Sequence, residues 1–265
     1  TINHSIFDIF SELNTIDVFY KKDFKINPKL YNYYKDTLYY YINHPKENSI
    51  VKLCLNITNN KEEIFNQIPH FMFPIVGIFG NVIPRLLLLL CNHKDEFRKV
   101  LNEIYNITNN NIYNYDTISK LDYLRKCILE TLRLNNSVFT TFRTLEKNYT
   151  FDDKYSFKKG DQFLILNYPI LRETDFFNFP NQFMPSRWNN EIENSYYNLT
   201  FNQGPQKCPG KDLCIYLIQS FIFNFIRLKQ IGIKQSIHSS KINRKNIPQV
   251  LNPCNIKFYF KSIQK

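Results

Sequence analysis

Hydrophobic positions in this chain repeat mainly at helical spacing. Residues 62–91 are predominantly apolar and predict one long helix, and residues 95–105 predict a second. Between residues 118 and 134, the apolar side chains at positions 121, 124, 128 and 132 fall on one helical face. Residues 212–230 form another amphipathic pattern of helical period. The chain is therefore predicted to be mainly α-helical.

A smaller part of the chain carries strand and loop patterns. The Lys158-Lys159-Gly160-Asp161 segment predicts a turn, because glycine adopts positive φ without steric cost. Residues 1–60 are helical in character, with a Tyr-rich segment that bears no motif. Residues 167–200 are predicted to be loop with short helices. The predicted strands are residues 141–146, 149–151, 162–166 and 255–261.

Length and charge narrow the range of functions. A chain of 265 residues can bury a full core, and we expect a single domain over residues 1–265. The net charge is +11, but the basic residues are dispersed and no nucleic-acid motif accompanies them. We therefore expect no nucleic-acid partner, and expect attraction to an acidic protein or an anionic membrane surface.

The cysteines and the apolar stretches indicate the cellular environment. The six cysteines contain no Cys-x-x-Cys pair, and Cys91, Cys127 and Cys214 lie in apolar helical settings typical of core positions. This usage suits a reducing compartment. The apolar stretch from Ile68 to Cys91 is interrupted by Pro, Asn and Arg, which does not favour a membrane span.

The segment around Cys208 carries the strongest chemical signal. Phe201, Gly204 and Gly210 surround this cysteine, and an apolar helical pattern follows directly. The two glycines would allow backbone turns that a Cβ atom obstructs, and a helix N-terminus favours a negatively charged sulfur. Phe201 could shield the sulfur from water and so tune an attached metal. The segment alone fits a thiolate metal ligand and a buried free cysteine equally well.

Two further segments favour the ligand interpretation. Glu130 and Arg133 lie three residues apart on the helix predicted for residues 118–134, so they share one face. Arg187 lies in a Pro-x-Arg-Trp segment that contains the only tryptophan of the chain. We expect these three side chains to form a partly buried charged triad with a structural role.

Together these segments resemble the cytochrome P-450 family. Phe201, Gly204, Cys208 and Gly210 match its haem-binding loop, while Glu130, Arg133 and Arg187 match its charged triad in the right order. The resemblance runs from roughly residue 64 to residue 261. It implies a partial haem-thiolate fold, mainly α with minor β, in which the N-terminal part of the family fold is missing or reduced.

The resemblance also implies which residues bind the cofactor. Cys208 would be the axial thiolate ligand of the iron of haem b, and Arg143 would pair with a haem propionate. Gln206 stands where the family usually has Arg or His at a propionate; it can donate a hydrogen bond without the charge. Lys207 would either compensate for that lost charge or be an ordinary surface residue.

The long helix departs from the family pattern. Family monooxygenases carry an acid and a threonine there that relay protons during oxygen activation. When the helix is aligned by its Leu90-to-His93 end, these positions fall on Gly77 and Ile78, and neither side chain can relay a proton. Asn81 is the nearest polar residue, and ordered waters bridged by it are the other route for protons.

Three functions remain open. The first is a cytochrome P-450 monooxygenase of an apolar small molecule, located in the cytoplasm or on the cytoplasmic face of a membrane. The second is a hydroperoxide isomerase, dehydratase or peroxygenase resembling allene oxide synthases, whose loop is similar to Gln203-Gly204-Pro205 but carries an insertion absent here. The third is a non-catalytic haem binder.

The substrate is expected to contact residues 71–81, residues 136–142 and the loop near Pro253. By position, helices in residues 1–60 would either roof the substrate cavity or simply pack on the core.

Overall fold

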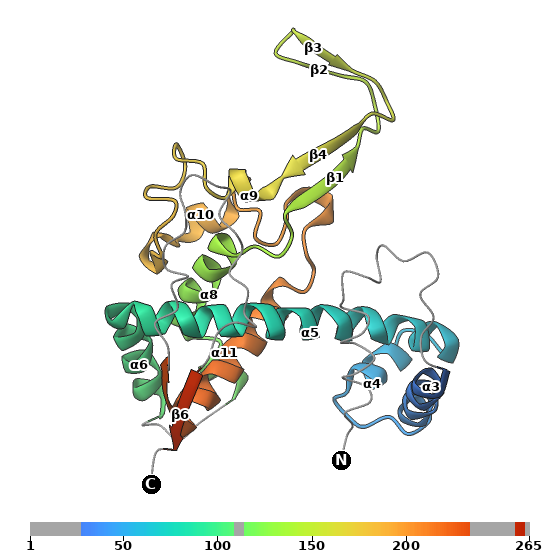
Figure 1. Ribbon diagram of the computed structural model, residues 1–265. Coiled ribbons are helices and arrows are strands. Elements are labelled where there is room, and N and C mark those ends of the chain that lie inside the picture. The colour runs from blue at the N-terminus through green and yellow to red at the C-terminus, as the bar shows by residue number, and fades with distance from the viewer. Residues whose placement is uncertain (1–27, 109–113, 234–257, 263–265) are drawn as a thin grey trace. The chain divides into compact units, whose positions relative to one another are not determined.

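The computed structural model describes residues 28–108, 114–233 and 258–262, and its fold is mainly α with minor β (Figure 1). The first half of the described chain is helical. Its helices are α3 (Pro28–Asn43), α4 (Ile50–Leu55), α5 (Lys61–Asn92), α6 (Lys94–Thr108), α7 (Tyr115–Ile118) and α8 (Asp122–Leu134).

The second half mixes strands, short helices and one long helix. In order, it contains β1 (Thr140–Thr144), β2 (Tyr149–Phe151), β3 (Tyr155–Phe157), β4 (Gln162–Leu166), α9 (Asn167–Ile170), the 3-10 turn η1 (Pro185–Arg187), α10 (Asn190–Asn194), the 3-10 turn η2 (Gly204–Gln206), α11 (Lys211–Leu228), β5 (Lys229–Ile233) and β6 (Phe258–Ser262).

The long helices follow the periodicity of the sequence. The predictions for residues 62–91, 95–105 and 212–230 correspond to α5, α6 and α11, with ends shifted by a few residues. The single helix predicted over residues 118–134 is wrong at its start. Asn114 and Thr117 form a reciprocal capping box that starts the separate helix α7, and α8 begins only at Asp122.

The strands form three antiparallel pairs among the described residues. β1 pairs with β4, and β2 pairs with β3 at the far end of that ladder (Figure 1). Gly160 has φ +95°, as predicted for its turn. β3 was not predicted, because its hairpin turn uses Asp152 and Asp153 at φ +53° and +49° rather than the usual Asn-Gly signal.

The last pair joins two segments far apart in the sequence. β5 follows α11 directly and pairs with β6, so that Lys229 faces Ser262 and Ile233 faces Phe258. The helix predicted to reach residue 230 therefore ends at Leu228. The strand predicted for residues 255–261 corresponds in part to β6, and residues 255–257 lie outside the described ranges.

The chain packs as two compact units, with the boundary between Gly80 and Asn81. In the first unit, α3 contributes a buried stripe at helical spacing, and Tyr39 stacks on Phe65 of α5 with ring centroids 5.0 Å apart. This core consists of aromatic and aliphatic side chains from α3, α4 and α5. Its buried members are Tyr34, Leu38, Ile42, Val51, Ile64, Phe65 and Ile68.

In the second unit, α8 lies at the centre of the core. It packs against α6, α11 and η1, and from Cys127 to Leu134 every residue is buried. Trp188 and Phe177 from the segment after β4 are fully buried as well. The polar groups of a buried helix must form hydrogen bonds within the protein, because water cannot reach them. The stability of α8 therefore depends on the partners of its two ends and of its charged side chains.

The backbone groups at the N-terminus of α8 form hydrogen bonds with side chains of neighbouring helices. The cap residue Leu121 has no side-chain acceptor, so Glu103 of α6 accepts the backbone N–H groups of Tyr123 at 2.7 Å and Leu124 at 3.0 Å. Gln219 of α11 donates to the carbonyl of Leu121 at 2.9 Å. These contacts tie three helices together at the start of α8, and sequence inspection did not identify them.

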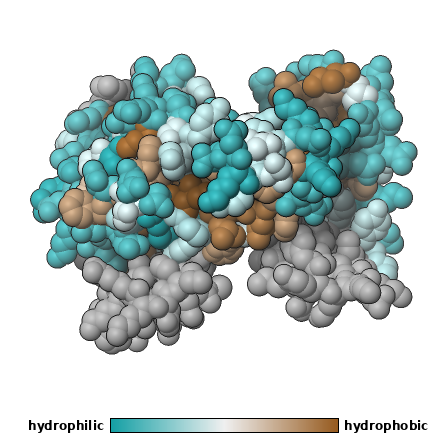
Figure 2. Space-filling model, turned by 90° about the horizontal axis from the view of Figure 1, so that it is seen from above, coloured by the Kyte–Doolittle hydropathy of each residue, from teal (hydrophilic) through white to brown (hydrophobic). Residues whose placement is uncertain are grey.

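On the face seen from above, the described residues present a mostly hydrophilic surface with smaller hydrophobic areas (Figure 2). Exposed apolar side chains include Phe142 and Leu164 of the β1–β4 ladder and Phe151 of β2. Within the described ranges, no helix combines the length and the apolar character needed to cross a bilayer.

The pKa of Glu103 generates a testable pH dependence. Burial and the nearby charge of Asp122 raise it from 4.5 to about 7, although the backbone N–H groups and Lys126 act in the opposite direction. The folded state therefore binds this proton more tightly than the unfolded state, so stability falls as the pH rises from about 4.5 through about 7.

Replacing Glu103 by Gln should remove this loss. In chemical denaturation, the difference in unfolding free energy between Glu103→Gln and the native protein should shift in favour of the variant as the pH rises through that window. Glu191→Gln, at an exposed carboxyl, serves as the control and should not produce this trend. A pH-independent difference for Glu103→Gln would contradict the assignment.

Candidate functional site

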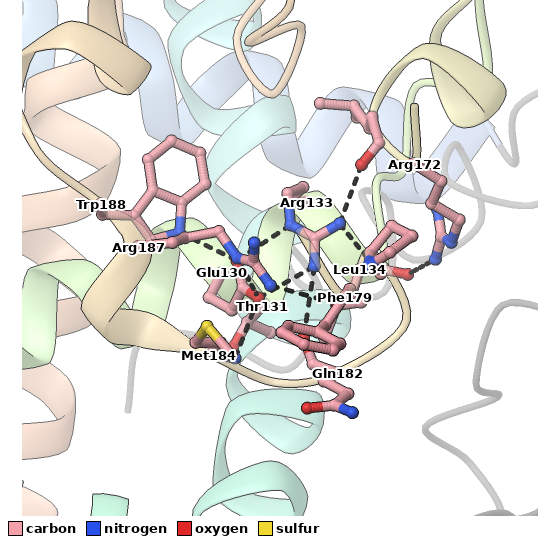
Figure 3. Close-up of polar contacts among 12 residues, drawn as sticks. Glu130, Thr131, Arg133, Leu134, Arg172, Phe179, Gln182, Met184, Arg187 and Trp188 are labelled. Atoms are coloured by element: carbon pink, nitrogen blue, oxygen red, sulfur yellow. Dashed lines mark hydrogen bonds and ion pairs between the residues drawn. The ribbon is translucent and has the colours of Figure 1, made fainter. Parts of the chain in front are cut away.

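Glu130 is fully buried, and its carboxylate is surrounded by donors (Figure 3). Both oxygens accept from the guanidinium of Arg133, each at 2.9 Å, in a fork-to-fork pair. The remaining donors come from the segment that contains η1. They are the Met184 backbone N–H at 3.0 Å, Arg187 Nε at 3.1 Å and Trp188 Nε1 at 2.9 Å.

The two arginines also donate hydrogen bonds to backbone carbonyls in the irregular segment between α9 and η1. Arg133 donates to the carbonyls of Leu171 and Pro180, each at 2.8 Å. Arg187 donates to the carbonyl of Asn178 at 2.6 Å. Burial, reinforced by the nearby charge of Arg133, lowers the pKa of Arg187, and Glu130 opposes that shift. The structure thus brings together the three side chains predicted to form a charged triad.

A third arginine borders the triad and was not identified from the sequence. Arg172 donates to the carbonyl of Leu134 at the C-terminus of α8, where cations are favourable (Figure 3). Its guanidinium lies 3.7 Å from the ring centroid of Tyr168. Burial lowers the pKa of Arg172 to about 10, and Arg133 contributes in the same direction.

The loop that carries Cys208 is closed by its own backbone. The N–H of Cys208 donates to the carbonyl of Phe201 at 2.9 Å, and the N–H of Lys207 donates to the carbonyl of Gly204 at 3.0 Å. Gly210 directly precedes α11 and accepts the N–H of Cys214 at 2.8 Å, so it caps the helix. Cys208 is half-buried and lies just before the first turn of α11.

The two loop glycines have different roles. Gly204 has φ +73°, a conformation in which a side chain is strained, as predicted. Gly210 does not require glycine for its backbone conformation. Its φ lies outside that region, and a Cβ atom there would be in ordinary contact, 3.9 Å from the sulfur of Cys208 and 3.8 Å from that of Cys214. Glycine at this position leaves space beside both sulfurs.

Strand β1 contacts this loop through two side chains. Arg143 Nη1 donates to Gln206 Oε1 at 2.5 Å, and Thr141 Oγ1 donates to Asn202 Oδ1 at 2.9 Å. The structure therefore brings together Arg143 and Gln206, the two residues that the resemblance assigned to propionate contacts. Lys207 is exposed. The contact of Thr141 could not be found from sequence, because a side-chain pair 61 residues apart has no local signal.

The described cysteines other than Cys208 differ in their burial. Cys127 and Cys214 are buried and Cys91 is half-buried, broadly as the apolar context predicted. Burial, with a smaller effect of Cys208, raises the pKa of Cys214 to about 11, and burial also raises the pKa of Cys91 to about 11. Buried, protonated thiols are poor metal ligands, which counts against Cys91 and Cys214 in that role.

The predicted substrate face is described only in part. Val138 and Phe139, between α8 and β1, are 44% and 48% exposed, so they are not core residues. Pro253 lies outside the described residues. Gly77 and Asn81 lie within α5, which ends at Asn92.

The Glu130 network predicts a large loss of stability when its carboxylate is removed. Glu130→Ala would leave Arg133 and Arg187 as buried cations without their anion, at a cost of about 3–5 kcal/mol. Urea denaturation measures the effect. The matched control is Asp95→Ala, which removes an exposed i,i+3 ion pair to Arg98 worth about 0–1 kcal/mol. Equal stability of both variants would contradict a structural role for the triad.

Comparison with known proteins identifies the same family that the sequence motifs resemble. The profile of the family described as cytochrome P-450 matches residues 41–254. The chain is 26% identical over 181 residues to cytochrome P-450 52C1 of Candida tropicalis and 25% identical over 180 residues to a C-22 sterol desaturase of Candida albicans. These matches cover 64% and 66% of this chain, but only 36% and 35% of the relatives. The chain thus spans about a third of their length.

A solved structure agrees with the fold. The crystal structure of a mutant cytochrome P-450 haem domain superposes with a TM-score of 0.69 at 16% sequence identity. The match covers 88% of this chain and 55% of the other. On the profile match, the triad and the closed cysteine loop, the chain belongs to the cytochrome P-450 family.

Proposed function

We propose that the protein containing this chain is a haem-thiolate oxidoreductase, a monooxygenase of an apolar small molecule. One observation carries the proposal. Cys208 lies in a self-closed loop at the start of an 18-residue helix, and Arg143 meets Gln206 on the same loop. Membership of the family supports haem as the cofactor, and Cys208 is the proposed thiolate ligand.

The residues present fit a haem group. Cys208 supplies a sulfur, and Gly210 leaves space beside it. Arg143 supplies a cation for an anionic propionate. Among the described residues, both hydrogen bonds of its guanidinium use Nη1, so Nε and Nη2 remain for a further acceptor. When bound, the haem would supply cleavage of the O–O bond, which a thiolate ligand promotes.

The remaining roles are assigned to side chains of the loop and its surroundings. The first-turn amides of α11 favour negative charge on the Cys208 sulfur. Phe201, which is half-buried, would limit water near that sulfur. Gln206 orients Arg143 by accepting its N–H, and its own amide nitrogen can donate to a propionate. Glu130, Arg133 and Arg187 maintain the fold and take no part in the reaction.

The proposals for the substrate, the redox partner and the location rest on less specific observations. The partly exposed apolar side chains of Val138, Phe139 and Phe142 support an apolar substrate, as does the similarity to a sterol desaturase. The net charge of +11 supports an acidic redox partner and peripheral contact with an anionic membrane. We propose the cytoplasm, or the cytoplasmic face of a membrane, as the location.

The composition of α5 supports a second candidate, a hydroperoxide-using isomerase, dehydratase or peroxygenase. Gly77 and Ile78 occupy the positions aligned with the proton-relaying pair, and residues 71–80 contain no acid, Ser or Thr. A hydroperoxide substrate brings its O–O bond ready-made, so it needs neither reductase nor the same proton delivery. Asn81 could instead hold ordered waters that deliver protons.

Replacing Cys208 tests the first proposal. In the complete haem-loaded protein, Cys208→Ser should abolish the reduced-CO absorption that is characteristic of a thiolate ligand, because serine provides no sulfur. Cys214→Ser is the matched control: it lies six residues further along the chain, inside α11, and should retain that absorption. Unchanged absorption in Cys208→Ser would show that another residue is the ligand.

Comparing oxidants distinguishes the two candidates. Because general acid help is worth about 10²–10⁴-fold, turnover with a fatty-acid hydroperoxide should exceed reductase-driven turnover. A Gly77→Asp/Ile78→Thr double variant should raise the reductase-driven rate. Gly80→Asp is the control, since it adds the same acid to the same helix where a Cβ meets no atom within 4 Å. Tightly coupled reductase-driven hydroxylation by the native protein, with little peroxide released, would reject the hydroperoxide candidate.

A further inference from the structure

Both ends of the Cys208 loop contact one short segment of the chain, residues 190–198, which consists of α10 and the four residues that follow it. At the start of the loop, Gln203 Nε2 donates to the carbonyls of Ser195 and Asn198, each at 3.1 Å. At its end, Lys211 Nζ lies 2.7 Å from Glu193 Oε1. Cys208 lies between these two attachment points.

The attachment at Glu193 also includes the central helix. The same oxygen, Glu193 Oε1, pairs with Arg125 Nη2 of α8, so one carboxylate joins α8, α10 and α11. The side chains of Lys211, Glu193 and Arg125 are only 11%, 17% and 26% exposed. Water screens such a cluster far less than an exposed pair, so its loss should be felt by the elements that it joins.

The segment itself is internally fixed. Asn198 Nδ2 donates to the carbonyl of Glu193 at 2.8 Å, and Asn198 Oδ1 accepts from Thr200 Oγ1 at 2.6 Å. The Asn189 side chain caps α10 by accepting the N–H of Ile192. Burial by itself would raise the pKa of Glu193, but the hydrogen bond from Lys211 and the charges of both cations lower it, so the carboxylate stays ionised near neutral pH.

We propose that Glu193 and Gln203 are positioning residues, which hold the two ends of the Cys208 loop against residues 190–198 and so fix the place of the sulfur. The inference rests on the proposed function, in which Cys208 binds the haem iron. Glu193 acts through Lys211 at the first position of α11, and Gln203 acts at the residue before the Gly204 turn. Strand β1 contacts the same loop at Gln206 through Arg143 and at Asn202, beside Gln203, through Thr141, but neither of these contacts reaches the Lys211 end.

Amide hydrogen exchange of the complete protein as isolated tests the mechanical part. The reporters are the Cys208 and Lys207 N–H groups, which close the loop. In Glu193→Gln, which keeps the shape and removes the charge, their exchange should be roughly tenfold faster. Asp95→Asn is the isosteric control, because it removes an ion pair that is 69% and 82% exposed, and it should leave the reporters unchanged.

Lys211→Met provides a second route to the same result, since it removes the cation and leaves Glu193 with Arg125. It should accelerate the same amides. The double variant with Glu193→Gln should be no faster than the faster single variant, because the ion pair between Glu193 and Lys211 is already lost in each single variant. Gln203→Leu should accelerate them independently. Native exchange of both reporters in all three single variants would overturn the proposal.

In the haem-loaded protein, the reduced-CO absorption reports on the position of the sulfur rather than on the stability of the fold. In Glu193→Gln and Lys211→Met, a fraction of the haem should lose the thiolate-type reduced-CO absorption, whereas Asp95→Asn should keep it all. Faster loop exchange with full thiolate absorption in both variants would show that the contacts stabilise the loop without positioning the sulfur, and would overturn the inference. Failure of the proposed function is seen separately, as a Cys208→Ser variant that keeps the native absorption.

Discussion

The burial of one carboxylate constrains the rest of the second unit. Glu130 has no exposed surface, and an ionised carboxylate removed from water is tolerated only when its oxygens are fully hydrogen-bonded. Its five hydrogen bonds come from α8 itself and from the irregular segment that contains η1. That segment has no regular ladder of its own, so the charge on α8 determines its course. The cost of burying the charge is offset only when the whole arrangement is formed.

This dependence extends from the triad to the cysteine loop. The segment held by Glu130 leads directly into residues 190–198, which contact Gln203 and Lys211 on either side of Cys208. The loop is therefore connected to α8 twice, once through the backbone that follows the triad and once through the pairing of Glu193 with Arg125. The charged network around Glu130 can thus influence the position of the Cys208 sulfur, the proposed ligand, because the loop that carries it is short.

The sequence predicted the elements whose signals are local. Helices α5, α6 and α11 have strong 3.6-residue periodicity, and the triad and the Cys208 loop are short motifs with fixed spacing. The missed features depend on partners far away in the sequence. The cap of α8 by Glu103, the end of α11 at β5 and the contacts of Glu193 arise only when separate helices and strands meet. The Asn114–Thr117 capping box is a local signal for the start of α7, but the break before α8 is concealed by the uninterrupted apolar pattern.

The loop also shows why residue type alone does not determine a role. Cys208 and Cys214 belong to the same short region, and a glycine between them is close to both sulfurs. Cys214 lies inside α11, where its N–H is bonded to Gly210 and burial raises the pKa of its thiol to about 11. Cys208 precedes the helix, where first-turn amides without helical partners favour negative charge. The different roles proposed for two identical side chains therefore rest on where the helix begins, which is marked by the Gly210 carbonyl that accepts the N–H of Cys214.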